Sequence, residues 1–175
     1  MPLKTMTIST KSILTRPKRV LAFDPGFGRL GVAVLEKSGG KELLLYSDCV
    51  RTSALLSYAE RLRVVGEAAE GLIEIWEPEV IALEHVFFEK NAKTAIGIAG
   101  VCGVLAYITA THNLPLFEYT PLEVKVAITG YGKSDKAAVG MMVKKLVSIP
   151  VKKRLDDELD AIAIGLTCLA AARAL

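Results

Sequence analysis

The most constraining feature of the sequence is an acidic residue at the end of an apolar strand, and it occurs twice. In "LAFDPGFGRLGVAVLE", residues 21–36, Asp24 closes an apolar run, Pro25 and Gly26 turn the chain, and apolar residues then resume. In "VIALE", Glu84 closes a second run whose apolar residues are typical of a strand buried on both faces. Because the carboxyl ends of neighbouring strands lie together in an open sheet, we expect these two acids to meet.

Apolar runs and turn residues predict an α/β fold. Strands are expected at 20–23, 31–35, 43–50, 80–83 and 115–119. Helices are expected at 53–76, 91–111, 121–127, 134–146 and 159–174, with Leu55 and Tyr58 on the buried face of the first and Ser134 capping the fourth. The first three strands have short connections and are expected to be antiparallel, whereas a strand, helix and strand over 80–119 predict a parallel crossover.

A third group of acids opens the final helix, in "LDDELDAIAI". Asp157 and Asp160 are three residues apart and therefore share a helix face. Asp156, Asp157 and Glu158 also suit an ordinary first turn, where acids complement the helix dipole. Asp160 precedes an apolar stretch, where an unpaired acid is costly.

Four converging carboxylates would repel one another unless cations neutralised them. Carboxylate oxygens suit Mg²⁺ or Mn²⁺, and the chain has only two histidines and three cysteines, with no CxxC pair for zinc. Two such ions roughly 3.5–4 Å apart can activate a water and stabilise the leaving oxygen of a phosphodiester. The acids therefore predict a metal-dependent site for phosphodiester hydrolysis.

Length and charge suggest one domain with a basic extension. The 175 residues are 51% hydrophobic, enough for one sizeable core. Residues 1–20 hold five basic and no acidic residues, which leaves 17 basic against 19 acidic in the remainder. We therefore expect a flexible basic extension over 1–18 and one folded domain over 19–175 that carries the predicted site. The extension suits either phosphate contacts or an organellar transit peptide, and the scattered cysteines suit an intracellular, cytoplasmic or nucleoid-associated protein.

Residues 94–117 contain no charged side chain, so their hydropathy alone would allow a membrane span. His112, Asn113 and Pro115 interrupt the segment, which favours a buried helix, a turn and a strand, and no membrane association. Glycines at 97, 100 and 103 would let another helix approach, either in the same core or in a partner subunit. This helix is the expected dimer face.

The segments "AFDPGFGRLGVAVLE", "IALEHVFFEKNAKTA" and "LDDELDAIAI" together resemble the RuvC-type Holliday junction resolvases of the ribonuclease H-like superfamily. The similarity runs from about Arg19 to Ala171. It implies a five-stranded mixed sheet with helices on both faces, and a homodimer that acts in DNA recombination and repair. It also implies an endonuclease that resolves four-way junctions by paired symmetric nicks through a metal-activated water. Two Mg²⁺ ions per site, with Mn²⁺ able to substitute, and a branch-migration helicase as a further partner follow from the same resemblance.

The resemblance assigns roles to individual residues. The metal-binding and catalytic acids are Asp24, Glu84, Asp157 and Asp160, and Lys136 is a further catalytic-centre residue. The DNA contacts are Phe87, Lys90, Asn91, Lys125 and Lys136. Phe87 is at the position of an aromatic that stacks on a base. Core packing is the alternative for Phe87 and Phe88, and one of the two is expected to pack in the core. The chain departs from many relatives at Phe27, where a small or hydroxyl residue is usual, and at Cys168, where they have a histidine.

Four other interpretations fit parts of the pattern. A YqgF-like nuclease shares the opening acid and glycine turn but lacks the "EHVFFEKN" segment. The turn also resembles the phosphate-binding turn of sugar kinases and actin-like ATPases, which need two related domains. The segment "AITGYGKS" resembles a phosphate-binding P-loop but has Ala127 in place of its first glycine. A junction-binding module without cleavage would not need all four acids.

Overall fold

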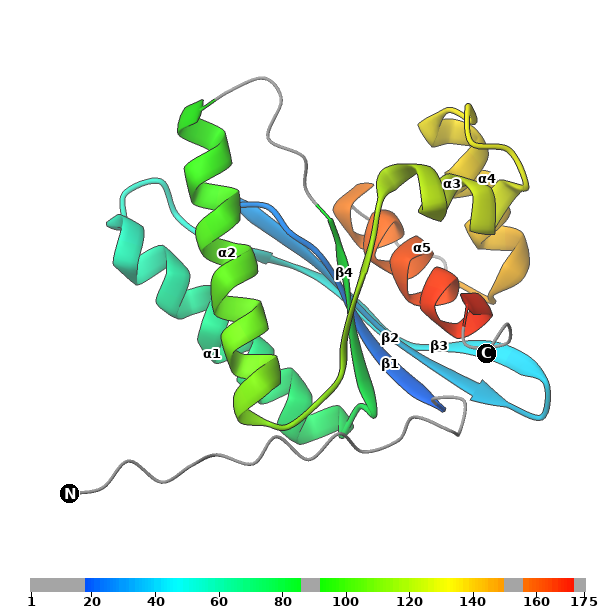
Figure 1. The fold of residues 1–175 in the computed structure, drawn as a ribbon, viewed down its shortest axis with the longest axis horizontal. Coiled ribbons are helices and arrows are strands. Elements are labelled where there is room, and N and C mark those ends of the chain that lie inside the picture. Colours follow the sequence, from blue (N-terminus) through cyan, green and yellow to red (C-terminus); the bar gives the residue numbers. More distant parts are fainter. Residues whose placement is uncertain (1–17, 86–91, 150–155, 172–175) are drawn as a thin grey trace.

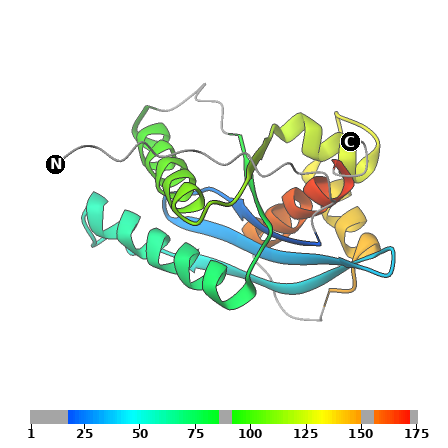
Figure 2. The same ribbon diagram turned by 60° about the horizontal axis from the view of Figure 1, so that its bottom comes forward.

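A computed structural model describes residues 18–85, 92–149 and 156–171, which form one sheet between two layers of helices (Figures 1 and 2). The strands are β1 (Arg19–Asp24), β2 (Arg29–Ser38), β3 (Lys41–Arg51), β4 (Val80–Glu84) and β5 (Leu116–Tyr119). The helices are α1 (Tyr58–Trp76), α2 (Ala92–Thr111), α3 (Pro121–Thr129), α4 (Lys136–Leu146) and α5 (Asp156–Ala171). The expected α/β fold with a five-stranded mixed sheet is confirmed. Except for Lys18, the expected basic extension lies outside the described residues.

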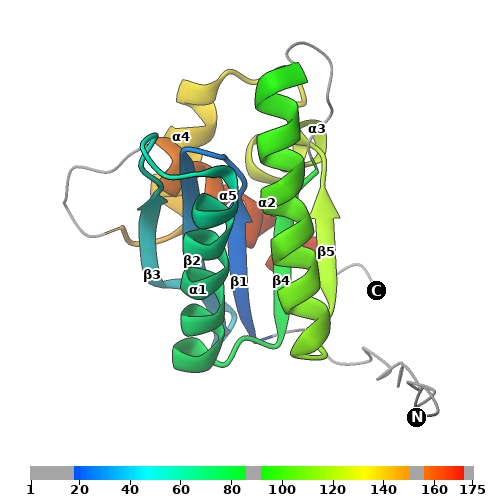
Figure 3. The same ribbon diagram turned by 90° about the vertical axis from the view of Figure 1, so that its left-hand side faces the viewer.

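The sheet has the strand order β3-β2-β1-β4-β5, which Figure 3 shows behind α1 and α2. β1 pairs with β2, and β2 with β3, in the antiparallel sense, as their short connections predict. β4 pairs in the parallel sense with both β1 and β5. The predicted crossover through α2 is therefore present, and β1 occupies the centre of the sheet.

The side chains of β1 alternate between two hydrophobic cores. Leu21 and Phe23 pack with residues of α1 and α2, whereas Val20 and Ala22 pack with α5 on the other face. Figure 2 shows α1 and α2 on one side of the sheet and α5 on the other. α5 lies close to the sheet because Gly165 has no side chain: a Cβ there would be 3.2 Å from the Cβ of Ala22. The alternation directs the side chain that follows Phe23 toward α5.

α1 begins later than the apolar spacing predicts. Ser57 forms a capping box with Glu60, in which the Ser57 hydroxyl accepts from the Glu60 N–H and the Glu60 carboxylate accepts from the Ser57 N–H. The predicted start at 53 is therefore wrong. Leu55 is 97% exposed and Tyr58 is about half exposed, so neither belongs to the buried face.

Residues 94–117 divide into α2, a turn and β5, but α2 is only half buried. Val101 and Leu105 face the core, whereas Ile96 is 65% exposed and Tyr107 is 70% exposed. The prediction of a buried helix is therefore wrong for its outer face. None of the helices in the described part of the chain is long and apolar enough to cross a bilayer.

The glycines of α2 serve two different surroundings. Gly97 and Gly100 face side chains of the same chain: a Cβ at either would overlap Phe27 or Tyr58, respectively. A Cβ on Gly103 would meet nothing within 4 Å. Residues of the same chain therefore approach α2 closely at Gly97 and Gly100, whereas the surface at Gly103 is uncovered.

Two further helix starts differ from the prediction. The N-cap of α4 is Asp135, whose carboxylate accepts from the Ala138 N–H, and not the neighbouring Ser134. α5 begins at Asp156 rather than at 159, so all the acids of "DDELD" lie on the helix. Residues 172–174 of the predicted final helix lie outside the described residues.

Candidate active site

Asp24 and Glu84 end adjacent strands of the sheet. In the parallel β1–β4 pair Phe23 lies opposite Leu83, and Asp24 and Glu84 follow these two residues. Ala22 and Ala82, two residues earlier on each strand, both pack toward α5. Because side chains alternate along a strand, the two acids point toward the same helix. Their predicted meeting at one edge of the sheet is confirmed by this register.

Gly31 lets the first turn of α5 come close to Asp24. It pairs with Asp24 across the β1–β2 ladder. A Cβ on Gly31 would overlap the carbonyl oxygen of Asp157 and lie 3.2 Å from the Cβ of Asp24. The missing side chain therefore allows the helix turn that carries Asp157 and Asp160 to lie beside the end of β1.

The four acids influence one another electrostatically. Burial, together with the charges of Glu84, Asp160 and Asp157, raises the pKa of Asp24 to about 7, while Lys136 acts in the opposite direction. Burial and the charge of Asp160 likewise raise the pKa of Glu84, against the effects of Lys136 and Lys125. The described carboxylates therefore form one repulsive cluster in which Asp24 is the most strongly affected.

Two basic side chains contact this cluster. The Lys136 Nζ donates a hydrogen bond of 2.6 Å to the Oδ2 of Asp160 and lies 3.9 Å from the Oδ2 of Asp156. The Arg29 Nε lies 3.3 Å from the Oδ2 of Asp157. Lys136, Asp156 and Asp160 also line an open cleft of about 510 Å³ between α4 and α5. A ligand in this cleft would reach the cluster from the α4 side.

The carboxylate oxygens are suitable ligands for a divalent cation, but their side chains are not arranged around one in this structure. The Oδ2 of Asp157 is buried and accepts no hydrogen bond from any described residue, although Arg29 is close. Within the described ranges, no three acidic, histidine or cysteine side chains surround a common point closely enough to form a ready metal site. Lys136 and Arg29 hold two of the acids, so a cation would require Asp160 and Asp157 to turn away from them.

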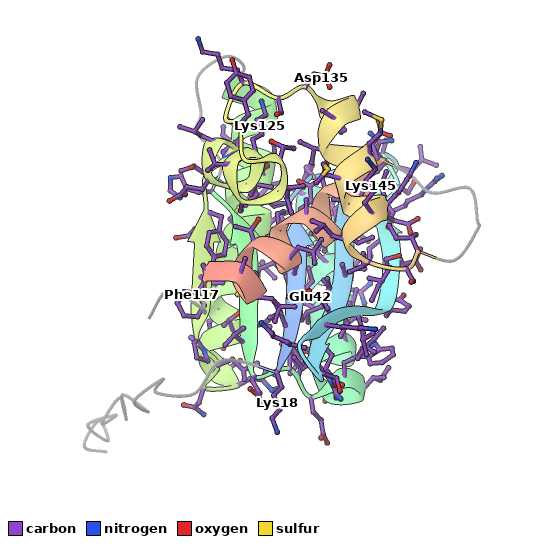
Figure 4. The ribbon with its side chains drawn as sticks, turned by 90° about the vertical axis from the view of Figure 1, so that its right-hand side faces the viewer. Lys18, Glu42, Phe117, Lys125, Asp135 and Lys145 are labelled. Atoms are coloured by element: carbon purple, nitrogen blue, oxygen red, sulfur yellow. The ribbon has the colours of Figure 1, made fainter. Side chains whose placement is uncertain are left out.

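The remaining predicted site residues divide into two groups. Lys125 lies on α3 and is close enough to Glu84 to affect its pKa. Figure 4 shows Lys125 and Asp135, which precedes Lys136, at one end of the molecule and Lys18 at the other. Phe87, Lys90 and Asn91 lie outside the described residues, as does Phe88.

Neighbouring acids on α5 have different surroundings, which the sequence does not distinguish. Asp156 is an exposed first-turn residue. Glu158 is 4% exposed and accepts a hydrogen bond of 3.1 Å from the Ser47 hydroxyl on β3. Glu158 therefore attaches α5 to the sheet next to Asp157. The buried Cys168 packs in the core and hydrogen-bonds Tyr119.

Sequence reasoning overlooked Arg29, which contacts Asp157. The only available signal was its place in "DPGFGR", directly after the turn that follows Asp24. Nothing in that segment indicates which acid of the distant α5 it would meet.

Comparison with known proteins identifies closely similar chains. The family model described as crossover junction endodeoxyribonuclease RuvC matches residues 20–168. The crossover junction endodeoxyribonuclease RuvC of Thermosipho melanesiensis is 43% identical over 152 residues, covering 87% of this chain and 96% of the relative. The protein of the same name from Rhodococcus jostii is 40% identical, covering 85% of this chain and 79% of the relative.

Solved structures show the same fold. T. thermophilus RuvC in complex with a Holliday junction substrate matches with a TM-score of 0.80 at 28% identity, covering 86% of this chain and 92% of that one. The yeast mitochondrial Holliday junction resolvase Ydc2 matches with a TM-score of 0.67 at 12% identity, covering 95% of this chain and 83% of that one, which supports the fold alone. The range that matches the family model includes all four clustered acids and Lys136.

Proposed function

Since this chain belongs to the RuvC family of crossover junction endodeoxyribonucleases, we propose that it resolves four-way DNA junctions by paired symmetric nicks made at the carboxylate cluster. The observation that carries the proposal is the convergence of Asp24, Glu84, Asp157 and Asp160 from β1, β4 and α5 within the range that matches the family. These acids, with Lys136, are the proposed catalytic residues. The activity is that of a structure-selective hydrolase in DNA recombination and repair.

The same four acids are the proposed ligands of two Mg²⁺ ions, for which Mn²⁺ would substitute. Bound cations of this kind activate a water and stabilise the leaving oxygen of a phosphodiester. The raised pKa of Asp24 supports the assignment because its causes include three neighbouring carboxylates, whose repulsion a cation would relieve. The buried Oδ2 of Asp157 offers a further oxygen donor.

Lys136 is the proposed residue that stabilises charge on the phosphate. Its ammonium has three donors, of which one is used on Asp160. The side chain is 61% exposed and lines the cleft beside the acids, so its other donors are accessible to a phosphate oxygen. Movement of Asp160 toward a cation would free the remaining donor.

DNA is proposed to lie across the end of the molecule that carries Lys125 and Lys136. Lys125 on α3 would contact a phosphate, and Phe87, Lys90 and Asn91 keep the DNA-contact roles that the resemblance assigns. Residues 21–175 carry a net charge of −2, so affinity would depend on these few lysines and on the basic extension. We therefore expect junction binding to weaken steeply with added salt.

The direct test is cleavage of a labelled synthetic four-way junction beside a linear duplex of the same sequence, in Mg²⁺, Mn²⁺ and EDTA. Paired nicks are expected in the junction only, and only with a divalent cation. Binding of the junction without any cut would instead favour a junction-binding module. If the linear duplex, or an RNA added as a third substrate, were cut as readily as the junction, a YqgF-like nuclease would be favoured.

The outer face of α2 is the proposed homodimer contact. Ile96 and Tyr107 are largely exposed, and the outward-facing positions between them, Ala99 and Gly103, are small. This apolar stripe on the outside of α2 has the composition of a buried helix face. A two-fold axis through it would provide two active sites for opposite strands of one junction.

Tyr107→Glu is expected to convert the dimer to a monomer, because it would bury a charge at the contact without touching the core. Light scattering coupled to size-exclusion chromatography measures the mass. Ile75→Glu is the matched control, since Ile75 is 73% exposed on α1 and lies outside the stripe. A wild-type monomer, or equal dissociation of both variants, would disprove the proposed contact.

A further inference from the structure

Residues 25–28 form a loop whose two ends both reach the acidic cluster. Asp24 precedes the loop, and Arg29, which follows it, contacts Asp157. A change in the path of the loop would therefore move one acid directly and a second through its basic partner. The loop is held by a residue outside the cluster, Arg61.

Arg61 on α1 holds the loop backbone. Its Nη2 donates a hydrogen bond of 3.0 Å to the carbonyl oxygen of Phe27, and its Nε donates one of 3.0 Å to the hydroxyl of Thr52. The Thr52 hydroxyl in turn donates to the same Phe27 carbonyl at 2.6 Å, and the Thr52 N–H donates to the carbonyl of Gly28 at 3.1 Å. One guanidinium thus ties the loop to the end of β3.

Arg61 also holds the loop through the side chain of Phe27. The guanidinium carbon lies 3.8 Å from the centroid of the Phe27 ring, which is the geometry of a cation–π contact. The ring lies 5.4 Å from that of Tyr58, and a Cβ on Gly97 would be 2.6 Å from it. Phe27 therefore packs against α1 and α2 while staying partly exposed, and any side chain at position 97 would force its ring to move.

We propose that Arg61 is a positioning residue for the metal site, which holds the 25–28 loop through the carbonyl and ring of Phe27 so that Asp24, directly before the loop, keeps its place. The inference rests on the proposed function and adds a residue outside the acidic cluster to it. Two of the five N–H donors of the planar guanidinium are used, from Nε and Nη2, while the guanidinium carbon lies over the ring. Lysine, with a single ammonium, cannot reproduce this combination.

The test compares Arg61→Ala and Arg61→Lys with Arg63→Ala, measuring Mn²⁺ affinity by calorimetry on the full chain without DNA. Arg63 is the matched control because it lies on the same helix, is 64% exposed and pairs with Glu67. Mn²⁺ affinity is expected to fall roughly 10-fold in both Arg61 variants, the scale of lost outer-sphere support, and to stay unchanged in Arg63→Ala. Junction affinity should change less than twofold, while cleavage should need more metal to reach half its maximal rate.

Two results would overturn the inference. Unchanged Mn²⁺ affinity with a lower melting temperature would make Arg61 structural only. Mn²⁺ binding that Asp24→Asn does not weaken would place the ion elsewhere. If Arg61→Ala does not fold, Arg61→Lys decides the question, because it keeps the charge and most of the side chain. Arg61-dependent Mn²⁺ binding in a wild-type protein that leaves junctions uncut would uphold the positioning role and disprove the proposed nuclease function.

Discussion

Asp24→Asn is expected to abolish junction cleavage, to leave junction binding within a fewfold of wild type, and to raise the melting temperature in EDTA. Cleavage is lost because an amide is a poor ligand for a hard cation at the centre of the cluster. Binding persists because the proposed DNA contacts are other residues. The melting temperature rises because the buried carboxylate, with three acids around it, destabilises the fold when ionised.

The pH dependence of this stability follows from the raised pKa. The pKa of Asp24 is about 7 in the folded protein, against 3.8 for an aspartate in an unfolded chain, so the folded state retains a proton that the unfolded chain loses. The folded protein therefore loses stability as pH rises from about 4 to about 7, and the loss is complete above that range. The advantage of Asp24→Asn in EDTA should be small at pH 4 and largest at pH 8.

Thermal melts with and without Mg²⁺ check this prediction. Saturating Mg²⁺ at pH 8 should stabilise the wild type and leave the variant nearly unchanged. Asp48→Asn is the control, since Asp48 is an exposed acid on β3. An Asp24→Asn protein that still cuts junctions, or that melts below wild type in EDTA at pH 8, would contradict the assignment of Asp24 as an electrostatically strained metal ligand.

Gly31→Ala is expected to lower the free energy of unfolding by roughly 1–3 kcal/mol, the usual cost of overpacking, and to remove most cleavage. The added methyl would overlap the carbonyl oxygen of Asp157, which belongs to helix backbone and has little freedom to move. α5 would have to shift from β2, and Asp157 and Asp160 would leave Asp24. Denaturant unfolding and single-turnover cleavage measure the two effects.

Gly71→Ala provides the comparison for this glycine. Gly71 lies within α1, where an added Cβ would meet nothing within 4 Å. Alanine there should stabilise the protein by up to about 1 kcal/mol, because it favours the helix. If Gly31→Ala were as stable and as active as Gly71→Ala, the approach of α5 to β2 would not depend on the missing side chain.

The strands and the four acids could be predicted because local sequence determines them. Apolar runs that end in Asp24 and Glu84 define β1 and β4, and parallel pairing makes their ends neighbours. The start of α1 was also readable, since Ser57 and Glu60 have capping-box spacing, but the apolar Leu55 suggested an earlier start. Ser134 and Asp135 are both good caps, so their order could not be decided from residue type.

The resemblance assigns Lys136 to the site, but the acid that each basic residue meets could not be predicted, because these pairings depend on tertiary contacts. Lys136 and Asp160 come from different helices, and Arg61 meets Phe27 only after α1 has packed on the sheet. The adjacent Asp157 and Glu158 look alike in sequence. Once α5 has packed on the sheet, Asp157 belongs to the cluster, whereas Glu158 accepts a hydrogen bond from Ser47.

The contact of α5 with the sheet at two glycines has a consequence for the construction of chimaeras. Gly31 on β2 makes room for the backbone of the helix, and Gly165 on the helix makes room for Leu35 and Ala22 on the strands. Each surface is therefore shaped for the other, although the two segments are far apart in the chain. A final helix transplanted from a relative would bring its own acids but would fit only with its native β1–β2 hairpin, so the two must be exchanged as one unit.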